Sequence, residues 1–199
     1  LFEKINNFKL LRYLYLKNLY FKKNFTLELN ELKLLSLDAC KNVKLSNGKL
    51  RELNISLINT RNINLLNKVN LKELNKLQLI WNKISNIDIL EKVNLKELKE
   101  LKELKELKEL KELKITWNNI SNINILGKVN FKKLIELNLS KNRISDINIL
   151  EKVNFNELEN LNLSKNKISD INILGKVNFK KLKELDLSNN KISDINILE

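Results

Sequence analysis

Leucines recur along this chain in a fixed arrangement that alternates with polar residues. Each unit has a central leucine, a second leucine three residues before it, and an apolar residue two residues after it. The leucines that open three successive units, Leu134, Leu158 and Leu182, are spaced by 24 residues. The central leucines are Leu14, Leu35, Leu53, Leu77, Leu113, Leu137, Leu161 and Leu185. The chain is therefore expected to be a stack of eight repeated units.

The alternation around each central leucine predicts a short strand, because residues two apart on a strand point to the same face. Beyond the strand, apolar residues such as Ile144, Ile147 and Leu150 recur at steps of three. This spacing is typical of a segment that returns along the far side of a core. No unit buries its leucines alone, so the units must stack and their strands must pair as a parallel sheet. We expect one domain over residues 1–199, with irregular units over residues 1–49 and an end that falls within a repeat.

Five units place an asparagine five residues after the central leucine, and another unit places a cysteine there. A side-chain amide that turns inward at this point can satisfy backbone groups that the bend frees. The chain contains no histidine to activate the cysteine, so a structural role is preferred over a catalytic thiol. The predicted structural column comprises Cys40, Asn82, Asn118, Asn142, Asn166 and Asn190.

This pattern, L-x-x-L-x-L-x-x-N/C-x-L, resembles the leucine-rich repeat over nearly the whole chain. The "ISDI" after the asparagine is similar to the short-repeat subtype of bacterial internalins and of the regulatory subunit of nuclear protein phosphatase. The resemblance implies an α/β repeat solenoid, a horseshoe with a parallel β-sheet on the concave side and short helices or turns on the convex side. The units exceed that subtype in length through "EKVNF" or "GKVNF". Ser145 or Asp146, and their equivalents, are the expected caps of the outer turn.

One low-complexity segment interrupts the period. Between Leu77 and Leu113 the spacing lengthens to 36, and the excess lies within "LKELKELKELKELKELKEL" at residues 95–113. Leucine, lysine and glutamate favour a helix, but leucines spaced by three form no single apolar stripe. We interpret the segment as a triplet expansion on the outer side. A coiled-coil partner site is the alternative, although its period would be seven.

Two tryptophans, Trp81 and Trp117, stand four residues after the central leucines of consecutive units. Later units carry Lys141, Lys165 and Asn189 there, so we expect this position on the exposed concave side, where the two indoles could stack. Clustered exposed apolar residues are typical of interaction sites. The alternative is that the tryptophans merely shield one another. The predicted partner site comprises Trp81, Trp117, Ile80, Leu57, Lys114, Lys141, Arg143, Lys165 and Lys167.

The formal net charge of +13 arises from 33 lysines and 4 arginines against 24 acidic residues. Such a charge is typical of binding to nucleic acid or to an anionic membrane, although AT-rich codons also produce lysine-rich chains. A concave face with an acidic border, including Glu112 and Glu136, and a basic border suits a protein partner better. Without histidine the chain lacks the usual general base and metal ligand.

We therefore predict a non-enzymatic protein-binding module without a cofactor, with a protein partner on the concave face. The alternative hypothesis is that the chain binds a polyanion through lysines on the outer side. A third hypothesis is that the chain is the recognition part of a larger enzyme. No apolar run reaches the length of a membrane span. Glycans at N-x-S/T sequons such as Asn138 and Asn162 would obstruct the concave face. This favours the cytoplasm or nucleus in a eukaryote and leaves a bacterial location open.

Overall fold

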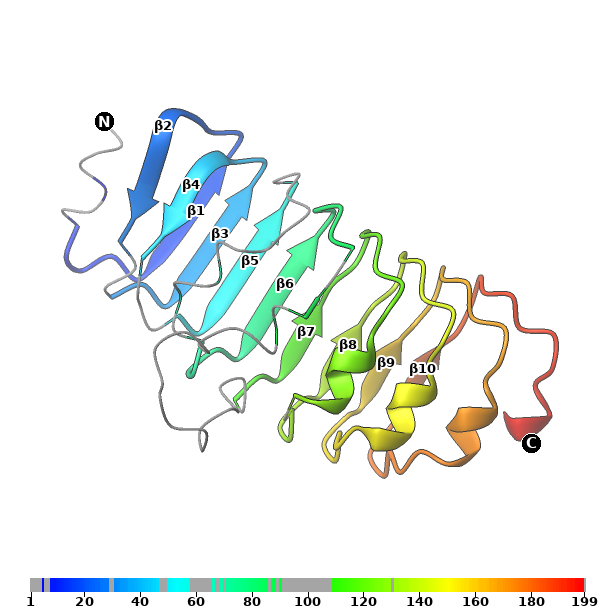
Figure 1. The fold of residues 1–199 in the computed structure, drawn as a ribbon. Coiled ribbons are helices and arrows are strands. Elements are labelled where there is room, and N and C mark those ends of the chain that lie inside the picture. Colours follow the sequence, from blue (N-terminus) through cyan, green and yellow to red (C-terminus); the bar gives the residue numbers. More distant parts are fainter. Residues whose placement is uncertain are drawn as a thin grey trace.

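The fold is a parallel sheet backed by a layer of outer segments (Figure 1). It was obtained as a computed structural model. The model describes residue 5, residues 8–28, 31–46 and 50–57, residues 66, 69, 71–85, 87, 88 and 90, and residues 109–129 and 131–198. The main sheet contains, in spatial order, β1 (Tyr13–Lys17), β3 (Leu34–Asp38), β5 (Glu52–Ser56), β6 (Lys76–Ile80), β7 (Glu112–Lys114), β8 (Glu136–Asn138), β9 (Asn160–Asn162) and β10 (Glu184–Asp186).

The register of this sheet aligns the central leucines of neighbouring units. Leu53 pairs with Leu35 on one side and with Leu77 on the other, and all of these pairings are parallel. The long spacing does not interrupt the sheet, because Leu77 pairs directly with Leu113. The predicted parallel repeat solenoid is confirmed. Residues 91–108, which hold most of the predicted insert, lie outside the described residues.

The core lies between the sheet and the outer segments. The central leucines of the six inner strands are fully buried, whereas Leu14 and Leu185 in β1 and β10 are half-buried. Farther from the sheet, the rings of Phe131 and Phe155 stack with centroids 6.2 Å apart, and Phe155 stacks on Phe179 at the same distance. Burial stabilises the fold by about 1.5–3 kcal/mol for each large apolar side chain.

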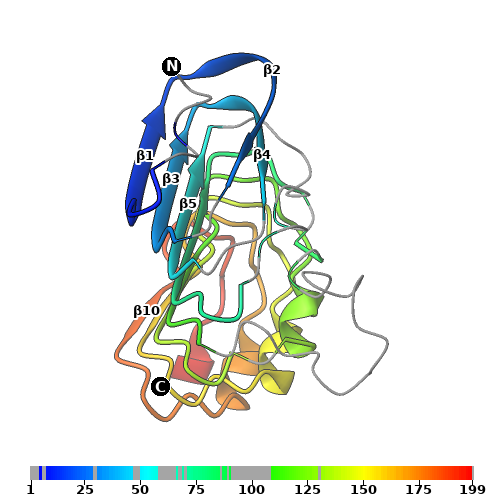
Figure 2. The ribbon, with the colours of Figure 1, turned by 90° about the vertical axis from the view of Figure 1, so that its left-hand side faces the viewer.

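The outer segments of the last four units contain short 3₁₀ helices. These are η3 (Asn124–Gly127), η4 (Asn148–Lys152), η5 (Asn172–Gly175) and η6 (Asn196–Leu198). In Figure 2 the green, yellow and orange helices lie across the core from the main sheet. The N-cap residues of η3, η4 and η5 are isoleucines, and none of these helices has a side-chain cap hydrogen bond. Asp146, expected as a cap, lies one residue before the N-cap, where its Oδ1 accepts the backbone N–H of Asn148; the same bond recurs at Asp170 and Asp194.

A second sheet, which the sequence analysis did not anticipate, backs the first units. It pairs β2 (Tyr20–Leu27) with β4 (Lys41–Leu45) in parallel, on the far side of the core (Figure 2). The sequence feature that could have indicated these strands is an alternation of apolar and polar residues. In β4, Val43 and Leu45 are at least half-buried and Lys44 is exposed. An extended strand advances about 3.3 Å per residue against about 2.0 Å for a 3₁₀ helix, so strands suit these shorter units.

Candidate functional site

Each strand of the main sheet ends in a left-handed residue. The backbone φ of the residue four positions after the central leucine lies between 51° and 58° in all eight units. In this region the β-carbon of an ordinary residue crowds the following carbonyl, at a cost of about 1–2 kcal/mol. We call these residues the exit column: Asn18, Ala39, Leu57, Trp81, Trp117, Lys141, Lys165 and Asn189.

The exit column places both tryptophans at the border of the sheet, where the chain turns away from its strand. Their rings stack with centroids 5.0 Å apart and an interplanar angle of 16°. They remain 52% and 45% exposed. On the side of Trp117 away from Trp81, Lys141 Nζ lies 3.9 Å from the ring centroid. Trp117 is therefore contacted by a neighbouring ring and by an ammonium group.

The two apolar neighbours that the sequence analysis assigned to the partner site differ in exposure. Leu57 precedes Trp81 in the exit column and is exposed. Ile80 ends β6 and is half-buried. The exposed apolar group at this border therefore consists of Leu57, Trp81 and Trp117.

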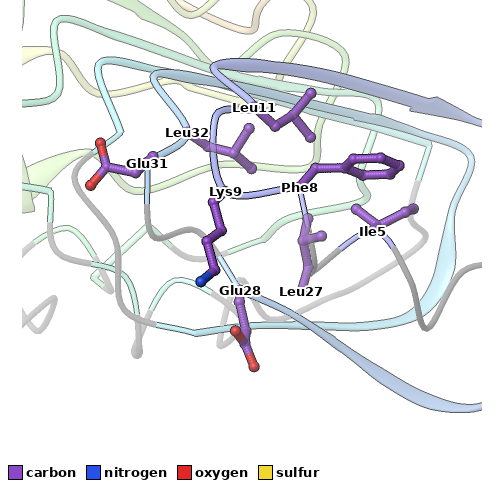
Figure 3. Close-up of a pocket in the computed structure, with 8 residues that line it drawn as sticks. All are labelled: Ile5, Phe8, Lys9, Leu11, Leu27, Glu28, Glu31 and Leu32. Carbon is purple, nitrogen blue, oxygen red and sulfur yellow. The ribbon is translucent and has the colours of Figure 1, made fainter.

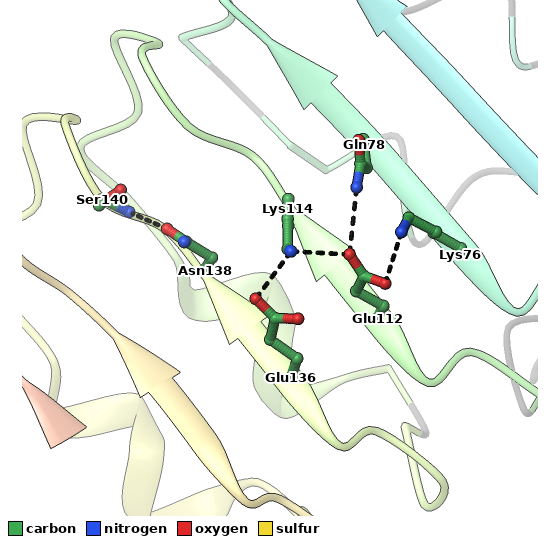
Figure 4. A network of polar contacts seen from close by, with 7 residues as sticks. All are labelled: Lys76, Gln78, Glu112, Lys114, Glu136, Asn138 and Ser140. Carbon is green, nitrogen blue, oxygen red and sulfur yellow. Dashed lines mark hydrogen bonds and ion pairs between the residues drawn. The ribbon is translucent and has the colours of Figure 1, made fainter. Parts of the chain in front are cut away.

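Away from this border, polar side chains form a network on the exposed face of the sheet (Figure 4). Glu112 accepts a hydrogen bond from Gln78 at 3.1 Å and forms ion pairs with Lys76 at 2.9 Å and Lys114 at 2.8 Å. Lys114 also pairs with Glu136 at 2.9 Å. The predicted partner-site residue Lys114 is thus held between two carboxylates.

These contacts determine the charge of the network. Burial raises the pKa of Glu112, but hydrogen bonds from Lys114, Lys76 and Gln78 outweigh it and hold that pKa below its ordinary value. Burial likewise lowers the pKa of Lys114, and Glu112 and Glu136 overcome this effect, so the net shift is upward. Two ammonium groups therefore offset two carboxylates on this part of the face.

A basic rim continues the exit column past the tryptophans. It consists of Lys141 and Lys165 in the column and of Arg143, Lys167 and Lys191, each two residues beyond a column position. Among the described residues, none of these five side chains lies within ion-pairing distance of a carboxylate. By contrast, Lys183, which precedes β10, contacts Glu159 at 2.9 Å. The rim is therefore a local excess of positive charge.

Directly behind the exit column lies the predicted asparagine column, which is structural. Asn118 Oδ1 accepts the backbone N–H groups of Asn82 and Ile84, each at 3.0 Å, and its amide donates to the carbonyl of Leu79 at 2.8 Å. Asn142 and Asn166 repeat this arrangement, and Asn190 repeats it at the half-buried end.

The cysteine of this column has the same structural environment. Cys40 Sγ lies 3.4 Å from the carbonyl oxygens of Leu16 and Asp38. Burial raises the pKa of the thiol, which disfavours a reactive thiolate. Within the described residues, no group of three His, Cys, Asp or Glu side chains is placed to hold a metal ion.

One pocket is lined by residues of the first units, which Figure 3 shows as sticks. Its volume of 270 Å³ is below the roughly 300–1,000 Å³ of most ligand sites. Sequence analysis did not identify it, because its residues come from separate segments with no shared motif. The lining residues are Ile5, Phe8, Lys9, Leu11, Leu27, Glu28, Glu31 and Leu32.

Comparison with known families agrees with the repeat geometry. A model for two copies of leucine-rich repeats matches residues 156–199, and a single-copy model matches residues 132–147. Leucine-rich repeats are thus recognised over these residues, and the fold of the chain is a leucine-rich repeat solenoid. The sequence matches none of the curated proteins with which it was compared. No helix in the described ranges has the length and apolar character needed to cross a membrane.

Solved leucine-rich repeat structures share the fold. Internalin C2 of Listeria monocytogenes superposes with a TM-score of 0.63 and 25% identity, over 88% of this chain and 73% of that chain. A second internalin from that organism, InlF, superposes with a TM-score of 0.50 and 21% identity, over 84% of this chain and 57% of that chain. A third structure is the ectodomain of the Arabidopsis thaliana receptor kinase GASSHO1/SCHENGEN3, solved with CASPARIAN STRIP INTEGRITY FACTOR 2. It superposes with a TM-score of 0.55 and 23% identity, over 89% of this chain and 21% of that chain. The resemblance to the phosphatase subunit stays a prediction.

Proposed function

We propose that this leucine-rich repeat chain binds a protein partner at the border of the exposed sheet face around Trp81 and Trp117. The observation that carries the proposal is the exposed tryptophan pair on left-handed backbone. Tryptophan is among the commonest residues that dominate binding energy at protein interfaces. The leucine-rich repeat fold in general supports protein-protein interaction and is typically a non-enzymatic scaffold.

The test replaces both tryptophans with asparagine, the residue that the chain itself has at exit-column positions 18 and 189. Losing the stacked pair costs about 0.5–1.5 kcal/mol, and asparagine tolerates left-handed backbone better than tryptophan does. We expect the free energy of unfolding to change by less than about 1 kcal/mol, because no core cavity forms. Partner binding should weaken by about 2 kcal/mol or more for each tryptophan lost.

The measurement compares proteins captured and cross-linked by the wild-type chain, by the Trp81→Asn/Trp117→Asn variant and by Ile135→Asn. Ile135 is an exposed apolar residue that precedes β8, at the opposite end of the strands, and serves as the matched control. A captured protein that depends on the tryptophans and not on Ile135 supports the proposal. A folded double variant that retains every captured protein contradicts it.

Polyanion binding is the second candidate function. The observation that favours it is a set of exposed lysines on the outer side, one per unit, at Lys128, Lys152 and Lys176. The equivalent positions Lys68 and Lys92 lie outside the described residues. Binding through these lysines would make log K for a nucleic acid fall steeply against log salt. A salt-independent interaction would exclude this mode.

A further inference from the structure

We infer that the basic rim binds an extended acidic segment of the partner protein, with the tryptophan edges beside it; this inference rests on the proposed function. The rim is formed by Lys141, Arg143, Lys165, Lys167 and Lys191. It adjoins the tryptophan stack directly, since Lys141 lies over Trp117.

The carboxylates in the middle of the exposed sheet face are compensated within the chain, because Lys76 and Lys114 pair with Glu112 and Lys114 also pairs with Glu136. The rim cations have no carboxylate partner among the described residues. An acidic segment laid along the rim would therefore meet uncompensated positive charge. Electrostatic complementarity of this kind increases association rates and selects partners.

The ring of Trp117 is contacted by the ring of Trp81 and by the ammonium group of Lys141, and it remains partly exposed. The edge of an aromatic ring carries the positive part of its quadrupole, and the indole N–H is a hydrogen-bond donor. Both features suit carboxylate and carbonyl oxygens. The tryptophans and the rim cations thus favour the same kind of partner group.

The same geometry argues against single-stranded nucleic acid. Proteins that bind single strands stack bases on the open faces of aromatic side chains. Trp81 and Trp117 stack on one another, and the Lys141 ammonium competes with a base for the ring of Trp117. A peptide needs no open ring face, because its carboxylates approach ring edges and ammonium groups from the side. The observations therefore favour an acidic peptide segment over a nucleic acid.

Neighbouring strands lie about 4.8 Å apart, so four steps from the unit of Trp81 to that of Lys191 span roughly 19 Å. An extended peptide advances about 3.3 Å per residue, and roughly six residues cover this distance. Alternate residues of such a peptide point the same way, about 6.6 Å apart. Side chains on one face of the segment are thus spaced to reach successive parts of the rim.

The test selects peptides from a random dodecapeptide display library on the wild-type chain. A selected peptide without tryptophan is then titrated while the fluorescence of the chain is followed. Because the chain has only 2 tryptophans and both belong to the stack, a fluorescence change reports contact at this site. We expect selected sequences to be rich in Asp and Glu, and to change this fluorescence on binding.

Two double variants with the same change in net charge separate the rim from general attraction. Lys165→Gln/Lys167→Gln should weaken peptide binding about fivefold, as expected for two lost ion pairs. Lys152→Gln/Lys176→Gln, on the outer side, should weaken it less than about twofold. Equal losses from both variants, or selected peptides without net negative charge, would overturn the inference. So would an oligothymidylate that binds more tightly than the peptide and changes the fluorescence.

These outcomes are distinguishable from failure of the proposed function. If Trp81→Asn/Trp117→Asn abolishes capture of a protein and acidic peptides do not bind, the binding site stands and the acidic class of partner is wrong. If acidic peptides bind at the rim and no captured protein depends on the tryptophans, the charge preference stands and the tryptophan-centred site is wrong.

Discussion

Replacing Asn142 with alanine tests how the solenoid is held together behind the exit column. The buried amide of Asn142 donates to the carbonyl of Ile115 at 2.7 Å and to that of Leu139 at 2.9 Å. Its oxygen accepts the backbone N–H of Ile120 at 3.1 Å. Ile115 and Ile120 belong to the preceding unit, so one side chain connects two units. Alanine removes all of these hydrogen bonds and leaves the backbone groups in place.

The expected loss in free energy of unfolding depends on which backbone groups are left without a hydrogen-bond partner. The Leu139 carbonyl still accepts a hydrogen bond from Asn166 at 3.1 Å. The Ile115 carbonyl and the Ile120 N–H have no other hydrogen bond in the described structure. A buried backbone group left unsatisfied costs about 1–3 kcal/mol, so Asn142→Ala should destabilise the fold by about 2–6 kcal/mol. Total stabilities are usually about 5–15 kcal/mol, and the loss is therefore a large share.

Urea unfolding followed by circular dichroism measures this loss. Asn154→Ala, at an exposed position in the same stretch of chain, is the control and should change stability by less than about 0.5 kcal/mol. Asn142→Cys should cost less than alanine, because the natural cysteine of the column, Cys40, places its sulfur 3.4 Å from two carbonyl oxygens. The reasoning is refuted if Asn142→Ala costs no more than Asn154→Ala.

Two further predictions concern the charged network and the insert. Burial raises the pKa of Glu112, but Lys114, Lys76 and Gln78 outweigh this effect and hold the pKa below its ordinary value. The stabilising contribution of Glu112 is therefore present above the unfolded-state pKa and lost as the pH falls through the lower folded-state pKa. The urea concentration at the unfolding midpoint should decrease as the pH is lowered below about 4.5. Glu112→Gln should reduce this pH dependence, and an unchanged dependence would contradict the stabilising role assigned to Glu112. Deleting residues 99–110 restores the 24-residue spacing and should leave a cooperative melt with slightly lower helicity, because β6 and β7 already pair across the insert. Loss of the folded state would place the segment in the core.

Sequence alone predicted the sheet and the asparagine column because both follow from periodicity. A one-residue slip would turn every central leucine toward solvent, so the leucine pattern determines which residues pair. The pairing of Leu77 with Leu113 across the long spacing shows how strongly the pattern acts. The asparagine column then follows, since each member stands at a fixed distance from a strand whose register is known.

The short outer helices were predicted, but the exit geometry and the second sheet were not, because they depend on neighbours that the pattern leaves unspecified. The left-handed conformation is usual for glycine and asparagine, and only Asn18 and Asn189 indicated it in a column otherwise filled by larger or apolar residues. The ion pairs of Lys114 depend on side chains in adjacent strands. The second sheet arises where short units require an extended return segment.

The exit column also distinguishes the two interpretations of the tryptophans. If they only shielded one another, their stack would need to offset the cost of placing two indoles on left-handed backbone. That cost is about 1–2 kcal/mol per residue, whereas a stacked aromatic pair contributes about 0.5–1.5 kcal/mol. Asparagine occupies the same backbone at Asn18 and Asn189, at lower cost and without exposing apolar surface. Stability therefore favours asparagine over the tryptophans and over Lys141, and the binding role that we propose would account for these larger side chains at the ends of the strands.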